Sequence, residues 1–175
     1  MMIQGIGDIS PAPITYDVYR KGKKLGGIWG VNMAKERVVT SIPCELVDFM
    51  REMNCWEVEL FEQRKEILAQ GAEDPELKEI YTRKLEGIFD AYAVKDKSNY
   101  GRLIDLGCIR PATYDPATDE LETLEAGKKT LTIRVQQTKG SETCSKIYLV
   151  YKDGVWKIKR REVLSFDDKW RRSPL

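Results

Sequence analysis

The hydrophobic periodicity of this chain changes once, near residue 100, and this change constrains the fold more than any other feature. Before the polar segment 95–99, apolar residues recur every three or four positions, which is the spacing of one face of an α-helix. After it, apolar and polar residues alternate in short segments, as in strands with one buried face. Helices followed by antiparallel strands predict an α+β domain whose helices cover one face of the sheet.

Two helices are predicted in the first half of the chain. The first begins after Ser41 and Pro43 and ends near Gly71, because a serine caps a helix and proline is tolerated in its first turn. The second begins at Asp74-Pro75, a cap followed by proline. Their apolar stripes contain Leu46, Phe49, Met50, Met53, Trp56, Leu60 and Ile67 in the first helix, and Leu77, Ile80, Tyr81, Leu85, Ile88, Phe89 and Tyr92 in the second.

Alternating segments in the second half predict an antiparallel meander. The predicted strands are residues 103–109, 120–124, 130–137, 143–151 and 155–164, separated by turns rich in Gly, Pro and Asp. Leu131, Ile133 and Val135 share one face of their strand, so we expect the helices to cover that face.

Residues 1–40 differ from the rest of the chain. They contain Pro11, Pro13 and six glycines, and segments 15–19 and 25–31 could pair as a hairpin. We therefore expect an N-terminal extension at 1–40, as a hairpin or arm, followed by one domain at 41–175. A chain of 175 residues is long enough for one domain with a sizeable core.

The composition excludes several classes of function. The chain has no histidine, which rules out Ser-His-Asp and Cys-His catalysis and most transition-metal sites. Its four cysteines form no CxxC pair, so they are expected to be reduced thiols. No apolar run approaches the roughly 18 residues of a membrane span, and no secretion signal is evident, so we expect a cytoplasmic protein without a membrane partner. No nucleotide-binding motif or other cofactor motif is present.

The charge is unevenly distributed although the whole chain carries only +1. Residues 41–95 have a net charge of −6 and residues 128–175 have +8. Acidic helices can attract a basic protein, and basic strands can attract an acidic protein or nucleic acid, so the asymmetry alone names no partner. Runs such as Lys159-Arg160-Arg161 are most often a solvated sheet edge.

Several short motifs occur in a characteristic order in the second half. They are Tyr100-Gly101-Arg102, Pro111-x-x-Tyr114-Asp115-Pro116, Gln136-Gln137-Thr138, Trp156-Lys157-Ile158 and Lys169-Trp170, with Trp56-Glu57 in the first helix. In this order and spacing, residues 41–175 resemble the NTF2-fold immunity proteins of bacterial polymorphic toxin systems. The resemblance implies an NTF2-like cone, with two N-terminal amphipathic helices packed on a curved antiparallel sheet. It also implies a cytoplasmic, non-enzymatic protein without cofactor or metal, which binds noncovalently to the C-terminal toxin domain of a large, contact-delivered protein in interbacterial competition.

The resemblance and the local chemistry together give six candidates for toxin contact: Tyr100, Arg102, Tyr114, Asp115, Gln137 and Trp170. Each also has a structural interpretation. A turn in which Arg102 packs on an aromatic ring is favoured over toxin contact. The Pro111–Pro116 segment is equally well explained as a scaffold or as a rigid loop with an exposed tyrosine. Gln137 is expected to be solvated or to line the mouth of the cone, and Trp170 to attach the C-terminal tail to the sheet.

Two other classes of function stay open at this stage. An NTF2-like small-molecule-binding protein or isomerase-type enzyme would use an apolar pocket lined by Trp56, Tyr81, Phe89 and Tyr92, and a core filled by its own side chains would count against it. A nucleic-acid-binding module on the basic strands ranks third. Exposed strand edges also allow a homodimer.

Overall fold

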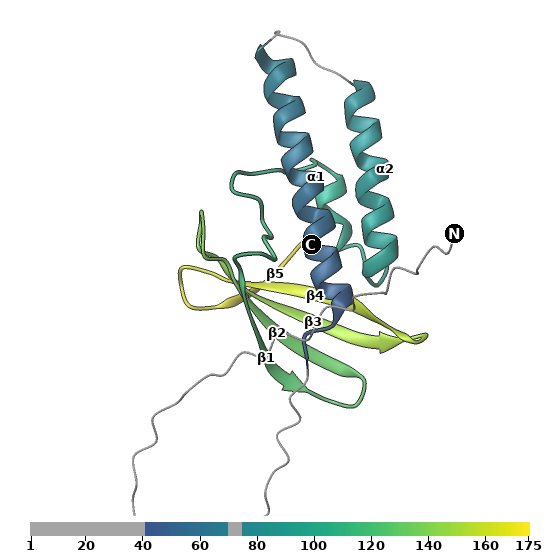
Figure 1. Cartoon of the computed structure of the whole chain (residues 1–175), viewed down its shortest axis with the longest axis vertical. Helices are drawn as coiled ribbons and strands as arrows, with labels where there is room; N and C mark the ends of the chain where they lie inside the picture. Colours follow the sequence, from purple (N-terminus) through teal and green to yellow (C-terminus); the bar gives the residue numbers. More distant parts are fainter. Residues whose placement is uncertain (1–40, 70–74) are drawn as a thin grey trace, which may run out of the picture. The chain divides into compact units, whose positions relative to one another are not determined.

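The structure is a computed structural model that describes residues 41–69 and 75–175 (Figure 1). Its elements are helices α1 (Cys44–Ala69) and α2 (Pro75–Tyr92), the short 3-10 helix η1 (Tyr100–Leu103), and strands β1 (Glu120–Ala126), β2 (Thr130–Gln136), β3 (Cys144–Lys152), β4 (Val155–Leu164) and β5 (Trp170–Ser173). Figure 1 shows α1 and α2 side by side on one face of the sheet. The α+β arrangement of two helices on an antiparallel sheet is confirmed. None of these helices is long and apolar enough to cross a membrane.

The sheet follows the order of the chain, β1-β2-β3-β4-β5, and every neighbouring pair is antiparallel. Its register places Ile133 opposite Ile147 and Leu149 opposite Ile158, so the apolar residues of β2, β3 and β4 lie on one face. Register shifts occur in the β1–β2 pair and the β3–β4 pair. Such shifts increase the local twist of a sheet.

The core lies between this apolar face and the two helices. Phe49, Met53 and Leu60 of α1 and Leu85 and Phe89 of α2 are completely buried. Each such side chain contributes about 1.5–3 kcal/mol relative to an exposed position, so this layer is the main source of stability. The prediction that the apolar stripes of the helices cover the sheet is confirmed for these residues.

Two predictions about the second half were wrong. Residues 103–109 form no strand, because η1 ends at Leu103 and Leu106 takes a left-handed backbone conformation with φ 50°. Strand β5 was missed as a strand, although Trp170 does attach the tail to the sheet, opposite Leu164 of β4. The predicted hairpin of segments 15–19 and 25–31 lies outside the described residues.

Candidate functional site

The longest irregular segment of the described chain connects η1 to β1 and spans residues 104–119, here called the η1–β1 loop. Loops of more than about 12–15 residues without secondary structure are uncommon in compact domains and are usually functional when ordered. This loop runs beside α1 (Figure 1). Its contacts therefore decide what surface it presents.

A buried ion pair fastens the loop at its centre. Glu57 of α1 is completely buried and pairs with Arg102 of η1, whose side chain is 13% exposed. The other carboxylate oxygen of Glu57 accepts a hydrogen bond from the backbone N–H of Thr113 at 2.7 Å, and Arg102 donates to the Thr113 hydroxyl at 2.7 Å. A buried carboxylate is tolerated only when it is paired and hydrogen-bonded in this way. The network joins α1, η1 and the loop.

Further side chains of α1 and the sheet bind the backbone of the loop. The Asn54 amide donates to the carbonyl of Tyr114, and the Arg64 guanidinium donates to the carbonyls of Leu106 (3.1 Å) and Asp105 (3.3 Å). From the end of β2, the Gln137 amide donates to the carbonyl of Ala112 at 3.1 Å. These bonds satisfy carbonyls that a strand would otherwise satisfy, and they fix the loop along its length.

Tyr114 turns inward rather than outward. It is 1% exposed, its ring packs edge-on against Phe49 with centroids 5.3 Å apart, and the Arg161 guanidinium lies 5.3 Å from its ring centroid. Burial raises the pKa of the Tyr114 hydroxyl. Of the two interpretations of this segment, the scaffold fits Tyr114 and the exposed tyrosine does not, because its ring packs on α1, a contact that proline-rich sequence alone does not reveal.

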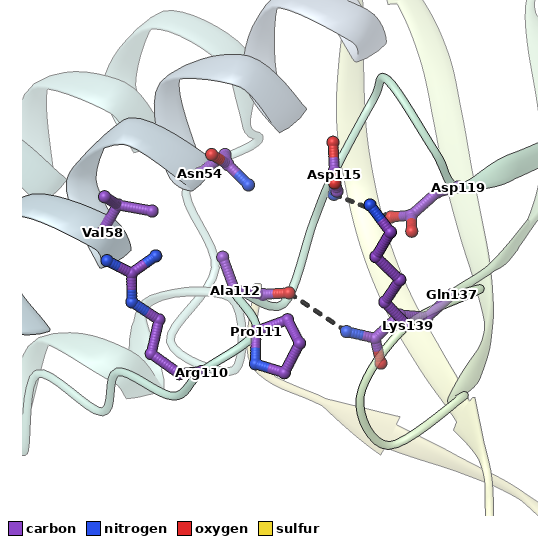
Figure 2. A pocket seen from close by; sticks show the side chains of 9 residues that line it. All are labelled: Asn54, Val58, Arg110, Pro111, Ala112, Asp115, Asp119, Gln137 and Lys139. Atoms are coloured by element: carbon purple, nitrogen blue, oxygen red, sulfur yellow. Dashed lines mark hydrogen bonds between the residues drawn. The ribbon is translucent and has the colours of Figure 1, made fainter.

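A pocket of about 270 Å³ lies where α1, the loop and the β2–β3 turn meet (Figure 2). It is lined by Asn54, Val58, Arg110, Pro111, Ala112, Asp115, Asp119, Gln137 and Lys139. Gly140 makes this junction possible, since its φ is +78° and a Cβ there would lie 2.7 Å from Pro111 Cδ. The turn therefore packs directly on the ring of Pro111.

The charged groups of the pocket are of both signs. Figure 2 shows the Lys139 side chain extending toward the carboxylates of Asp115 and Asp119. Asp119 accepts a hydrogen bond from the backbone N–H of Asp115 at 2.8 Å. Burial raises the pKa of Asp119, and the nearby charge of Lys139 opposes this shift. The lining therefore combines charged groups of both signs with the apolar side chains of Val58 and Pro111.

The outer side of the loop exposes large apolar residues. Ile104 is 81% exposed and Ile109 is 47% exposed, and Leu68 of α1, one turn beyond the loop-binding Arg64, is 76% exposed. Arg110 bridges the two elements, with its guanidinium 5.4 Å from the Phe61 ring and 2.8 Å from the Glu62 carboxylate. We call the surface formed by Ile104, Ile109, Arg110, Pro111, Phe61 and Leu68 the α1–loop face. Exposed apolar groups on a fixed backbone are typical of protein recognition.

Comparison with known proteins identifies the family. A model of the family described as NTF2 fold immunity protein matches residues 43–174. The chain belongs to this family. Immunity protein RhsIA of Dickeya dadantii (strain 3937) is 29% identical to the chain over 126 residues, which cover 71% of the chain and 89% of that protein. No solved structure matches. The resemblance seen in the sequence and the NTF2-like α+β fold are thus confirmed.

In this NTF2-fold immunity protein, three candidate residues support the loop. Arg102 belongs to the buried ion pair and Tyr114 to the core. Gln137 is 5% exposed and bonds to Ala112 and Thr143, so the prediction that it is solvated was wrong. The position of Gln137 at a strand end gives no sign in the sequence that the η1–β1 loop covers this side chain.

The other three candidates have separate positions. Asp115 lines the pocket and accepts hydrogen bonds from Ala117 and Thr118 within its own turn. The Tyr100 hydroxyl donates to Asp90 at 2.9 Å. Burial, and to a smaller extent this hydrogen bond, raises the pKa of Tyr100 to about 12. Trp170 lies in β5 under the ammonium of Lys146, 4.0 Å from the ring centroid. Of these three, only Asp115 lines the pocket together with Arg110 and Pro111 of the α1–loop face.

Sequence reasoning missed Glu57 as the central residue of the immunity protein's loop support. Its signal was present: Glu57 follows Trp56 within the apolar stripe of α1, and a carboxylate at a core-facing position needs a cationic partner. The identity of that partner, Arg102, depends on a contact between distant segments.

Three of the four aromatic residues predicted to line a ligand pocket fill the core of the immunity protein instead, and the fourth, Tyr92, is partly buried against that core. Trp56 is 2% exposed, Tyr81 6% and Phe89 0%, and the Trp56 indole donates to the carbonyl of Tyr81 at 3.0 Å. The small-molecule alternative is not favoured by this packing or by the family. Across residues 41–69 and 75–175, no group of three or more Cys, Asp or Glu side chains is arranged to hold a metal ion.

Proposed function

We propose that this protein neutralises a cognate toxin domain by noncovalent binding, and that the α1–loop face is the surface that contacts the toxin. The main support for this proposal is that the two sides of the η1–β1 loop differ in their contacts and exposure. Its inner side is fixed by hydrogen bonds from α1, η1 and β2, whereas its outer side exposes Ile104 and Ile109. A surface that is ordered before binding loses little conformational entropy on binding.

The candidate residues then act in three ways. Arg102, Tyr114 and Gln137 position the loop and do not touch the toxin, whereas Asp115 contributes a polar contact at the rim. Tyr100 and Trp170 stabilise the domain elsewhere. The protein acts as a stoichiometric inhibitor in the cytoplasm and not as an enzyme. Residues 41–175 supply the binding domain and residues 1–40 are an extension to it.

The partner is the C-terminal toxin domain of a contact-delivered protein encoded beside this chain. The family supports a toxin partner in general, and the related protein is named Immunity protein RhsIA. Exposed isoleucines at the centre of an interface, with Arg110 and Asp115 at its rim, fit a partner that offers an apolar depression surrounded by polar groups.

Growth rescue by matched variants tests the proposal. Cells that express the toxin domain should survive with the wild-type chain and die with Ile109→Glu, because a central interface substitution costs about 2 kcal/mol or more, which is roughly 30-fold in affinity. Ile80→Glu is the control, since Ile80 of α2 is 43% exposed, close to the 47% of Ile109, and lies away from the loop.

Thermal unfolding of both variants shows whether each is folded. Rescue by Ile109→Glu at the wild-type level would place the toxin on another surface. Failure of the wild-type chain to rescue would contradict the immunity function against that toxin.

A further inference from the structure

The pocket beside the α1–loop face contains a carboxylate oxygen that the chain does not satisfy. Asp119 is the last residue of the η1–β1 loop, and its Oδ2 accepts a hydrogen bond from the backbone N–H of Asp115 at 2.8 Å. Within residues 41–69 and 75–175, its Oδ1 is shielded from solvent and has no hydrogen-bond partner. The Thr138 backbone N–H opposes the rise that burial causes in the pKa of Asp119, but it does not satisfy this oxygen. Buried acceptors without a partner are uncommon, because each has given up its hydrogen bonds to water.

The charges that line the pocket do not balance. Arg110 is already neutralised, since its guanidinium pairs with the Glu62 carboxylate at 2.8 Å. The other charged residues of the lining are Asp115, Asp119 and Lys139. Two carboxylates thus share one ammonium, which leaves an excess of negative charge in the pocket. One additional cation would remove this excess.

Lys139 shows how a cation can enter the pocket. Figure 2 shows its side chain extending toward the carboxylates of Asp115 and Asp119, and its charge opposes the rise in the pKa of Asp119. Lys139 is exposed in the turn between β2 and β3, and the four-carbon stem of a lysine is flexible. Its ammonium can therefore move aside when a second cation approaches.

We propose that the pocket receives one cationic side chain, an arginine or a lysine, of the bound toxin domain, and that this cation replaces Lys139 beside Asp119. The inference rests on the proposed toxin binding at the α1–loop face, which shares Arg110 and Pro111 with the pocket. The entering group donates charge-assisted hydrogen bonds, which are about twice as strong as neutral ones. Val58 and Pro111 provide apolar surface for its aliphatic stem. Asp119 is then a specificity-determining residue for the toxin.

Calorimetric titration of the full chain with an inactive toxin domain tests the proposal through three variants. Asp119→Asn should weaken binding at least about tenfold, because the toxin cation loses its charged partner. Lys139→Gln should tighten binding about threefold, because it removes the competing ammonium. Glu122→Gln is the control and should leave the Kd unchanged, since this β1 carboxylate is 55% exposed and pairs with Arg134.

Chemical denaturation separates this role from a structural one. Asp119→Asn should not lower the free energy of unfolding, because it removes a charge that the chain leaves unsatisfied. Lower stability and lower affinity together in Asp119→Asn, without tighter binding by Lys139→Gln, would mean that Asp119 only supports the loop and would overturn the proposal. Wild-type affinity in Asp119→Asn would also overturn it and would leave the immunity function standing.

NMR titration with arginine amide tests the pocket without toxin. The amide signals of Asp115 and Thr138, whose N–H groups face the Asp119 carboxylate, should shift in the wild-type chain and far less in Asp119→Asn. If the wild-type chain binds no toxin, the proposed function fails and this titration alone decides on the cation site. Shifts at the two amides that depend on Asp119 support the site, and their absence overturns it.

Discussion

Replacing Glu57 by glutamine should destabilise the protein strongly, although the side chain keeps its shape. Glu57 is completely buried, and its two oxygens bind Arg102 and the backbone N–H of Thr113. Removing one member of a buried ion pair leaves the other charge uncompensated, at a cost of about 3–5 kcal/mol. Because the Arg102 side chain is 13% exposed and can recruit some water, we expect the lower end of this range, about 3 kcal/mol.

The expected loss is large enough for a simple assay. At about 2.1 cal/mol/K of unfolding entropy per residue, a domain of about 135 residues should lose about 10 °C in Tm for 3 kcal/mol. The matched control is Glu59→Gln, on the same helix, because Glu59 also forms an ion pair, with Lys84 at 2.8 Å, but both side chains are about half exposed. Exposed pairs contribute about 0–1 kcal/mol, so this Tm should move by at most about 3 °C.

Amide hydrogen exchange adds a second, local measurement. The N–H of Thr113 donates to Glu57, so its protection should fall more in Glu57→Gln than protection in the strands does. Equal and small Tm changes in Glu57→Gln and Glu59→Gln, together with unchanged protection at Thr113, would refute the reasoning that this ion pair fastens the loop.

Two further variants test the surroundings of the pocket. In chemical denaturation, Gly140→Ala should lower the free energy of unfolding more than Gly154→Ala does. Both glycines have a left-handed φ, which costs alanine about 1–2 kcal/mol, but only at Gly140 would the added Cβ meet Pro111. Equal losses in the two variants would refute this clash. Asp119→Asn should stabilise the protein more at pH 7 than at pH 3. Because the pKa of Asp119 is raised in the folded state, wild-type stability falls as pH rises through that pKa and the carboxyl ionises. Asparagine carries no charge at either pH, so it removes this loss at pH 7 only. Tm differences that do not vary with pH would contradict this cause.

Local patterns were sufficient to predict most of the fold. The helices begin at Cys44 and Pro75, next to the predicted caps, because capping and apolar spacing act within a few residues. Strand β4 has the predicted bounds, residues 155–164, since alternation and a turn at Asp153-Gly154 define it locally. The α+β class follows from the order of these elements.

The η1–β1 loop could not be predicted in the same way. Apolar and polar residues alternate in its first part as in a strand. However, Arg64, more than 40 residues earlier in the chain, donates hydrogen bonds to the carbonyls of Asp105 and Leu106. The sequence leaves open whether Tyr114 is exposed and favours a solvated Gln137, and contacts with distant segments bury both side chains. Burial of polar groups depends on such tertiary contacts, which periodicity does not record. The family motifs therefore fall in and around this loop, where Arg102, Tyr114 and Gln137 support its fold.

Calorimetric titration of the full chain with an inactive variant of the neighbouring toxin domain is the most direct test of the central claim. We expect one toxin per chain, a Kd in the nanomolar range or below, and a loss of affinity of roughly 30-fold or more for Ile109→Glu but not for Ile80→Glu. Absence of binding heat and of complex formation, or equal affinities for the two variants, would contradict it.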